Sequence, residues 1–95
     1  MTYDTLVFRK HAIERMFARG VGEAEVRHVL RTGEVIKDYP DDRPYPGRLF
    51  LGWSGERPIH VVAADNHDEK VTIVITVYRP KPEQWEPGFK RRKGQ

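Results

Sequence analysis

The chain has 95 residues and a mass of 11.1 kDa, which allows one small domain with one core but not separate cofactor and substrate domains. Hydrophobic residues make up 38% and charged residues 33%, the balance of a folded globular domain. The sequence contains no cysteine, which excludes disulfide scaffolds, thiol nucleophiles, iron–sulfur clusters and the usual structural zinc sites. Any chemistry must use oxygen and nitrogen groups, and we expect neither a cofactor nor a metal.

The formal net charge of +3 comes mainly from one basic run near the C-terminus: Lys90, Arg91, Arg92 and Lys93. Without this run the remaining basic residues are slightly fewer than the 14 acidic ones. No apolar stretch approaches the roughly 20 residues that span a bilayer, and the first residues do not resemble a secretion signal. We therefore predict a cytoplasmic protein without a membrane partner, with one domain over residues 1–85 and a basic tail over residues 86–95.

Two helices are predicted first along the chain. Residues 10–19 place apolar side chains on one side of a helix, and Gly20 follows where a left-handed cap is expected. A second helix is predicted to start near Gly22, where Glu25 stands in the capping-box position, and to end at Gly33. Its apolar face consists of Val26, Val29 and Leu30.

Extended structure is predicted after Gly33. A strand leads to Tyr39, a proline-rich loop covers residues 40–47, and strands follow over residues 48–53, 57–64 and 71–78. The last strand alternates, and we expect one set to face the core: Val71, Ile73, Ile75 and Val77. Two helices followed by consecutive strands predict an α+β domain, with both N-terminal helices packed on one face of a small antiparallel sheet. The other face would be free for function.

A polar stripe on the first helix is one candidate site, because His11, Arg15 and Arg19 recur at four-residue spacing. These groups could hold phosphates. For Arg19 a solvated side chain that covers the rim of the core is the better interpretation, whereas His11 and Arg15 leave both interpretations open.

The last hairpin is the second candidate, with His60 on one strand and Thr76, Tyr78 and Arg79 on the next. A connection of three or five residues places His60 on the face of Thr76 and Tyr78, whereas four residues place it with Ile75 on the other face. We favour the first arrangement, because an imidazole among aliphatic side chains would lack a partner.

Such a set suits cleavage of RNA through the ribose 2′-hydroxyl. A histidine can take or give the proton, and arginines can stabilise charge on the phosphorane without a metal. Metal binding has little support, because Asp65, His67 and Asp68 are most simply a polar turn. The loop with Arg43, Tyr45 and Arg48 is either a substrate lip or a connector, and Trp85 is expected to hold the tail against the body.

Five ordered motifs resemble the bacterial family called domain of unknown function 4258: His11-x-x-x-Arg15-Met16-x-x-Arg19-Gly20, Tyr39-Pro-Asp-Asp, Leu51-Gly52, Pro58-Ile-His60-Val-Val and Ile75-Thr76-Val-Tyr78-x-Pro80. The resemblance covers nearly the whole chain, to Trp85 and the Arg92-Lys93 end. It implies a fold like that of RelE and ParE toxins, a ribonuclease activity, and a cognate antitoxin of zinc-finger or helix-turn-helix type. The family's recurring polar residues fall on His11, Arg15, His60, Thr76 and Tyr78.

Three hypotheses follow. The first is a metal-independent endoribonuclease toxin acting on free or ribosome-bound RNA, with His60 as acid or base, Arg15 on the phosphate, and His11, Tyr78 and Thr76 assisting. The RNA would also contact Arg19, Arg48, Arg79, Lys90, Arg91, Arg92 and Lys93. The second is a non-enzymatic module that binds a protein or nucleic acid through the open sheet face and the tail, and the third is a toxin with a protein target.

Overall fold

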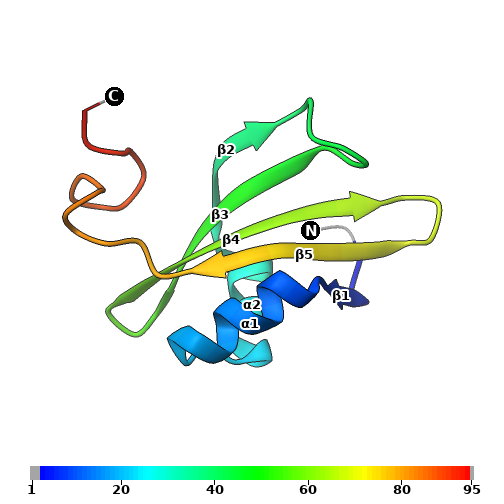
Figure 1. Ribbon diagram of the computed structural model, residues 1–95, viewed down its shortest axis with the longest axis horizontal. Helices are drawn as coiled ribbons and strands as arrows, with labels where there is room; N and C mark the ends of the chain where they lie inside the picture. Colours follow the sequence, from blue (N-terminus) through cyan, green and yellow to red (C-terminus); the bar gives the residue numbers. More distant parts are fainter. Residues whose placement is uncertain (1–2, 95) are drawn as a thin grey trace.

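Residues 3–94 are described by the structure, a computed structural model in which two helices cover one face of a five-stranded sheet (Figure 1). The prediction of an α+β fold is confirmed. Met1, Thr2 and Gln95, which belong to the predicted domain and tail, lie outside the described residues.

The two helices have the expected bounds and caps. Helix α1 (Lys10–Arg19) ends at Gly20, whose φ of 67° is left-handed and therefore favours glycine. Helix α2 (Glu23–Thr32) begins where the Glu25 carboxylate accepts a hydrogen bond of 3.1 Å from the Gly22 backbone N–H. No helix within residues 3–94 is long and apolar enough to cross a bilayer.

The sheet has the strand order β1-β5-β4-β3-β2 and is mixed. Strands β2 (Glu34–Tyr39), β3 (Gly47–Ser54), β4 (Arg57–Asn66) and β5 (Val71–Tyr78) form an antiparallel meander. Strand β1 (Leu6–Phe8) pairs with β5 in parallel, so the prediction of a purely antiparallel sheet is wrong. Three residues are too few to show an alternating pattern, and a strand at the far edge is held by pairing across the chain rather than by local sequence.

The main core lies between the helices and the sheet. Strand residues Phe50, Ile59, Val61, Ala63, Val74 and Val77 pack here against Ala12, Val26, Val29 and Leu30 of the helices. Helix α2 approaches β3 so closely that a Cβ at Gly52 would lie 2.5 Å from a methyl carbon of Val29. Gly52 is therefore required by the close contact between helix and strand.

Strand β5 corrects one sequence prediction. Thr72, Val74 and Val77 are its buried residues, so the expectation that Val71, Ile73 and Ile75 face the core is wrong, while that for Val77 is confirmed. The Thr72 hydroxyl avoids the cost of burial by donating a hydrogen bond of 2.7 Å to the Asp65 carboxylate.

A β-bulge explains the change of face within β5. Val62 pairs with Thr76 and Ala63 pairs with Val74, so Ile75 is an extra residue on β5. Beyond the bulge, His60 pairs with Tyr78. The connection between β4 and β5 has four residues, 67–70, yet the bulge restores the register that places His60 with Thr76 and Tyr78.

Candidate functional site

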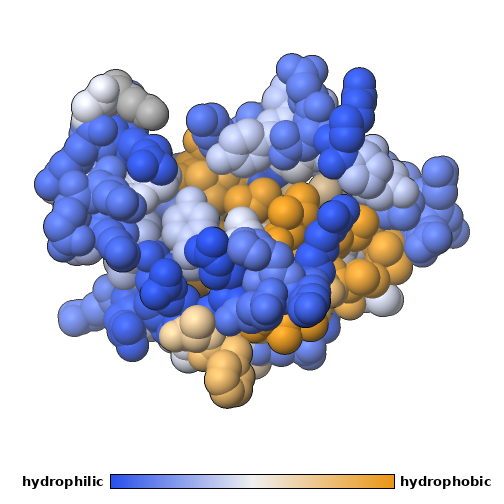
Figure 2. Space-filling model, in the orientation of Figure 1, coloured by the Kyte–Doolittle hydropathy of each residue, from blue (hydrophilic) through white to orange (hydrophobic). Residues whose placement is uncertain are grey.

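A groove crosses the sheet face that is turned away from the helices, which we call the open face. It has a volume of about 690 Å³ and is lined by residues of three strands and of the C-terminal segment: Ile36, Lys37, Tyr39, Leu49, Tyr78, Trp85, Lys90, Arg91 and Arg92. Figure 2 shows hydrophobic atoms in a recess between hydrophilic groups at the left and at the upper right. The groove thus combines an apolar floor, aromatic rings and a cationic edge.

The C-terminal segment, residues 80–94, forms one wall of the groove. It leaves the end of β5 and curls above the left end of the sheet (Figure 1). Trp85 is 6% exposed and pairs with Arg92 in an isolated β-bridge, and the Arg92 guanidinium lies 5.7 Å from the Trp85 ring centre. The expectation that Trp85 holds the tail against the body is confirmed.

His60 lies beneath this segment and is fully buried. Its Nε2 lies 2.9 Å from the backbone carbonyl oxygen of Phe89, and its Nδ1 lies 3.1 Å from the Tyr78 hydroxyl. A carbonyl oxygen only accepts, so Nε2 carries the hydrogen, and the neutral ring accepts the Tyr78 O–H at Nδ1. The Trp85 ring meets His60 edge to face at a centroid distance of 4.5 Å.

Burial governs the titration of this pair. It lowers the pKa of His60 to about 4, against which the hydrogen bond to Phe89 acts only in part. Burial also raises the pKa of Tyr78, with a smaller contribution from Tyr39. The pair is therefore a neutral imidazole and a neutral phenol at physiological pH.

Three of the predicted catalytic residues come together on the open face. His60 and Tyr78 are cross-strand partners, and Thr76 pairs with Val62 one step along the same face. The shared face favoured from sequence is thus confirmed, whereas the expected connection of three or five residues is wrong, because it has four and the bulge changes the face. Three of the four predicted tail cations, Lys90, Arg91 and Arg92, line the groove, whereas Lys93 contributes a backbone N–H to the Gln84 carbonyl at 2.9 Å.

The residues predicted on the first helix do not join this group. His11 and Arg15 are exposed on α1, which packs against the opposite face of the sheet, so the sheet separates them from His60. Arg48 is also outside the groove and lies 3.4 Å from the Asp38 carboxylate. The structure therefore does not assemble the predicted set of His60, Arg15 and His11.

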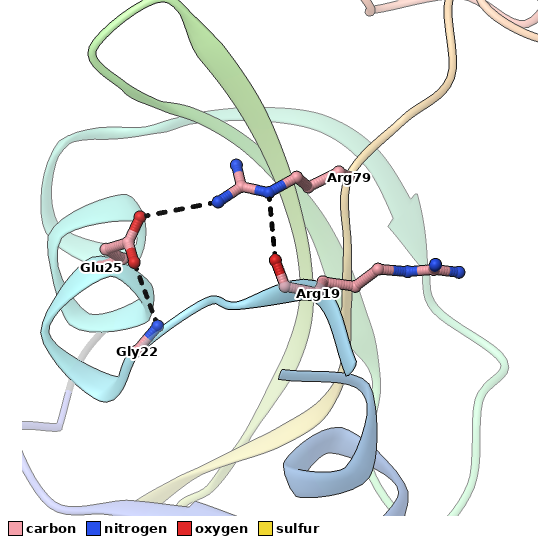
Figure 3. Close-up of polar contacts among 4 residues, drawn as sticks. All are labelled: Arg19, Gly22, Glu25 and Arg79. Atoms are coloured by element: carbon pink, nitrogen blue, oxygen red, sulfur yellow. Dashed lines mark hydrogen bonds and ion pairs between the residues drawn. The ribbon is translucent and has the colours of Figure 1, made fainter. Parts of the chain in front are cut away.

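Arg19 and Arg79 meet at the end of β5, outside the groove. The Arg79 Nε donates to the backbone carbonyl of Arg19 over 3.5 Å, and its Nη2 lies 3.9 Å from the Glu25 carboxylate (Figure 3). The Arg19 guanidinium points away from this contact. Within residues 3–94, the buried Nη1 of Arg79 has no hydrogen-bond partner.

Sequence reasoning missed the three groove residues on β2, which are Ile36, Lys37 and Tyr39. Lys37 and Tyr39 line the groove, and the Lys37 ammonium lies 5.4 Å from the Tyr39 ring centre. Their alternate spacing along the strand was the available signal, because i and i+2 share a face. A second β-bulge lies between Val35 and Lys37, so the alternation of faces does not hold along the whole of β2.

No group of three His, Asp or Glu side chains suited to a metal occurs in the described part of the chain. His67 instead contacts the Tyr3 hydroxyl, with its Nδ1 2.7 Å from the hydroxyl oxygen.

Comparison with known proteins identifies a family. The model of the family described as "Domain of unknown function (DUF4258)" matches residues 8–79. No curated protein and no solved structure matches the chain. The matched range contains His60, Thr76 and Tyr78 but ends before Trp85 and the basic run, so the family match covers the sheet side of the groove and not its C-terminal wall.

Proposed function

The chain belongs to the DUF4258 family, and we propose that it is a toxin-like, metal-independent endoribonuclease that binds single-stranded RNA in the open-face groove. One observation carries the proposal. The groove brings the rings of Tyr39, Tyr78 and Trp85 together with four cations: Lys37, Lys90, Arg91 and Arg92.

This combination of aromatic rings and cations suits single-stranded RNA better than an RNA duplex. Unpaired bases stack on accessible aromatic rings, here those of Tyr39 and Tyr78, whereas the buried Trp85 supports the wall of the groove. The cations neutralise the phosphates that run beside the bases. A folded duplex would present its bases to each other and leave the rings unused. The recess in Figure 2 lies between the C-terminal segment and strands β2 and β3. It gives the RNA a path across the sheet.

The Tyr78–His60 pair supplies the proposed proton transfer. The Tyr78 hydroxyl gives its hydrogen to His60 Nδ1, which leaves the phenol oxygen to accept the proton of a ribose 2′-hydroxyl. The freed 2′-oxygen attacks phosphorus, the bond to the 5′-oxygen breaks, and a 2′,3′-cyclic phosphate forms. His60 becomes the imidazolium and returns its proton through Tyr78 to the departing 5′-oxygen. The neighbouring arginines stabilise the charge on phosphorus.

In this scheme His60 acts through Tyr78 rather than by touching the RNA, which differs from the direct role expected from sequence. Burial lowers the pKa of His60 to about 4, so the ring is in the neutral form that accepts a proton, although as a weak base. Thr76, one step along the face, is proposed to orient a phosphate oxygen. Arg15 and His11 have no part in the reaction.

The partner proposed is an antitoxin that covers helix α1. Phe17 is 89% exposed and Ile13 is 54% exposed, and their four-residue spacing places them on one side of the helix. Large apolar side chains exposed at helical spacing are typical of a face that receives another protein. The proposed antitoxin would leave the groove, on the opposite face of the sheet, open to RNA.

The test uses a fluorescently labelled single-stranded RNA, the purified protein and a metal chelator. We expect cleavage with 2′,3′-cyclic phosphate ends. Tyr78→Phe keeps the ring and removes the proton path, so it should still bind but cleave at least about 100-fold more slowly, within the usual range for a lost acid–base group. Tyr3→Phe, which removes a hydroxyl bonded to His67 elsewhere, is the matched control.

Binding is measured separately from cleavage. The double variant Arg91→Gln, Arg92→Gln should bind more weakly and reduce the slope of log affinity against log salt by about 1.4, or 0.7 for each lost phosphate contact. Arg31→Gln on the exposed end of α2 should change neither quantity. Binding without cleavage, even with ribosomes added, would support the non-enzymatic module instead, and absence of both would overturn the proposal.

A further inference from the structure

Another hollow lies at the end of β5, where the first residues of the C-terminal segment and Phe89 line it. It has a volume of about 400 Å³, and we call it the Arg79 pocket. Four cationic residues line it, Arg19, Arg57, Arg79 and Lys81, against the single carboxylate of Glu56. Pro58 and Phe89 contribute apolar wall.

Arg79 is the unusual member of this set. Its side chain is only 16% exposed, and its Nη1 is buried without a hydrogen-bond partner among residues 3–94. The contacts of its other two nitrogens are long, 3.5 Å to the Arg19 carbonyl and 3.9 Å to Glu25. In Figure 3 the third nitrogen points away from both of these partners. A buried charged donor without a partner in the described chain is costly, and the other two contacts are long, so the chain itself satisfies this guanidinium only weakly. An acceptor bound in the pocket beside it would add to its hydrogen bonding.

The charges specify the kind of acceptor. An arginine is always protonated, and its planar guanidinium matches the oxygens of a phosphate. Glu25 is one carboxylate beside Arg79, and its pKa is lowered chiefly by the hydrogen bond from the Gly22 N–H, with smaller contributions from Arg79 and Arg57. Glu25 and Glu56 together do not balance the four cations. An anion bound here would therefore meet a net positive field.

We propose that the Arg79 pocket binds a phosphate group, held by Arg79 and by the exposed side chains of Arg57 and Lys81. Two sources supply this chemistry: the 5′-terminal phosphate of an RNA and the phosphate of a free mononucleotide. The pocket and the groove share the C-terminal segment, because Phe89 lines the pocket while its carbonyl accepts the hydrogen bond of His60 at the groove. Only the first source rests on the proposed function.

The experiment follows backbone amide resonances of the intact protein during titration with inorganic phosphate, then with a mononucleotide. We expect shifts at Arg57, Arg79 and Lys81. The double variant Arg57→Gln, Lys81→Gln changes exposed residues, and we expect it to weaken phosphate binding about tenfold or more, as loss of charged hydrogen bonds does. Arg31→Gln, a cation remote from the pocket, should bind as the wild type does.

Two RNA oligonucleotides, one with a 5′-phosphate and one with a 5′-hydroxyl, distinguish the sources. If the RNA end is the source, the phosphorylated strand binds more tightly, and the double variant removes that advantage. Equal binding of both strands together with binding of the mononucleotide assigns the pocket to a free nucleotide. If phosphate causes no shift at the pocket, or the same shift in the double variant, the proposal is overturned, even where RNA still binds in the groove.

Discussion

The two faces of the β-sheet differ in what covers them. Two helices cover one face, whereas a C-terminal segment without a helix covers part of the other (Figure 1). A helix satisfies its own backbone, so the side chains beneath it can be almost entirely apolar. An irregular segment has free carbonyl groups, and the sheet must provide a donor for them.

His60 meets that need on the open face. It is fully buried under the segment, and its Nε2–H donates to the Phe89 carbonyl, which has no partner in regular secondary structure. The segment satisfies some of its other groups internally, by the bond of 2.8 Å from the Glu86 N–H to the Arg91 carbonyl. The comparison teaches that one buried polar residue can substitute for the missing secondary structure of a covering element.

The largest expected effect compares equivalent truncations on the two faces. Ile59→Ala should lower the free energy of unfolding by about 3 kcal/mol, because the cavity forms in the rigid core beneath the helices. Leu51→Ala, a 4% exposed residue paired with His60 on the open face, should cost about half as much, because the C-terminal segment can settle into the space. Urea denaturation of both variants checks this, and equal losses would mean that both covers are equally rigid.

The second prediction is that the free energy of unfolding depends on pH because His60 is buried on the open face. Burial holds the pKa of His60 at about 4 in the folded protein, below the ordinary 6.5, so the unfolded chain binds more protons between these values. The contribution of the neutral His60 to the free energy of unfolding is fully present above about pH 6.5. It is lost as the pH decreases toward 4, which lowers the free energy of unfolding by up to about 3 kcal/mol.

Denaturation between pH 7.5 and 4.5 measures the slope, and His60→Gln should flatten it. The lower limit avoids Glu25, whose pKa is lowered chiefly by the Gly22 N–H, so that its contribution is lost only at more acidic pH. An unchanged slope in the variant would show that the imidazole is accessible to protons in the folded protein.

The smallest effect concerns the ion pair between Lys90 and Glu34, which joins the segment to β2 at 3.0 Å. Both side chains are more than half exposed, so Glu34→Gln should change the free energy of unfolding by less than about 0.5 kcal/mol. A thermal melt of the variant beside the wild type checks this. A larger loss would show that charge, rather than Trp85 and His60, attaches the segment to the sheet.

Much of the fold could be predicted from sequence because its signals are local. Gly20 and Gly33 mark the helix ends, and the apolar spacing of Val26, Val29 and Leu30 marks the buried face of α2. Strand β1 and the bulge at Ile75 escaped because they depend on pairing with distant residues. Alternation alone placed Thr72 on the wrong face, since its partner Asp65 lies on another strand.

The candidate site could be predicted only in part, for the same reason. His60, Thr76 and Tyr78 share a hairpin, so one choice of register was enough to group them. The separation of His11 and Arg15 from that group follows from the side of the sheet on which α1 packs. No local spacing in the sequence indicates on which face of the sheet α1 packs. None indicates that the Phe89 carbonyl accepts a hydrogen bond from His60.

The parallel pairing of β1 with β5 also orders events during translation. Leu6 and its partner Thr72 lie far apart in the sequence, so at about 5 to 20 residues per second several seconds separate their synthesis. The apolar side chains of Leu6 and Phe8 have no place in a sheet during that interval. The groove comes later still, because Trp85 and Arg92 form its wall. A nascent chain that has not yet reached Arg92 therefore lacks this wall of the groove, which the proposed activity requires.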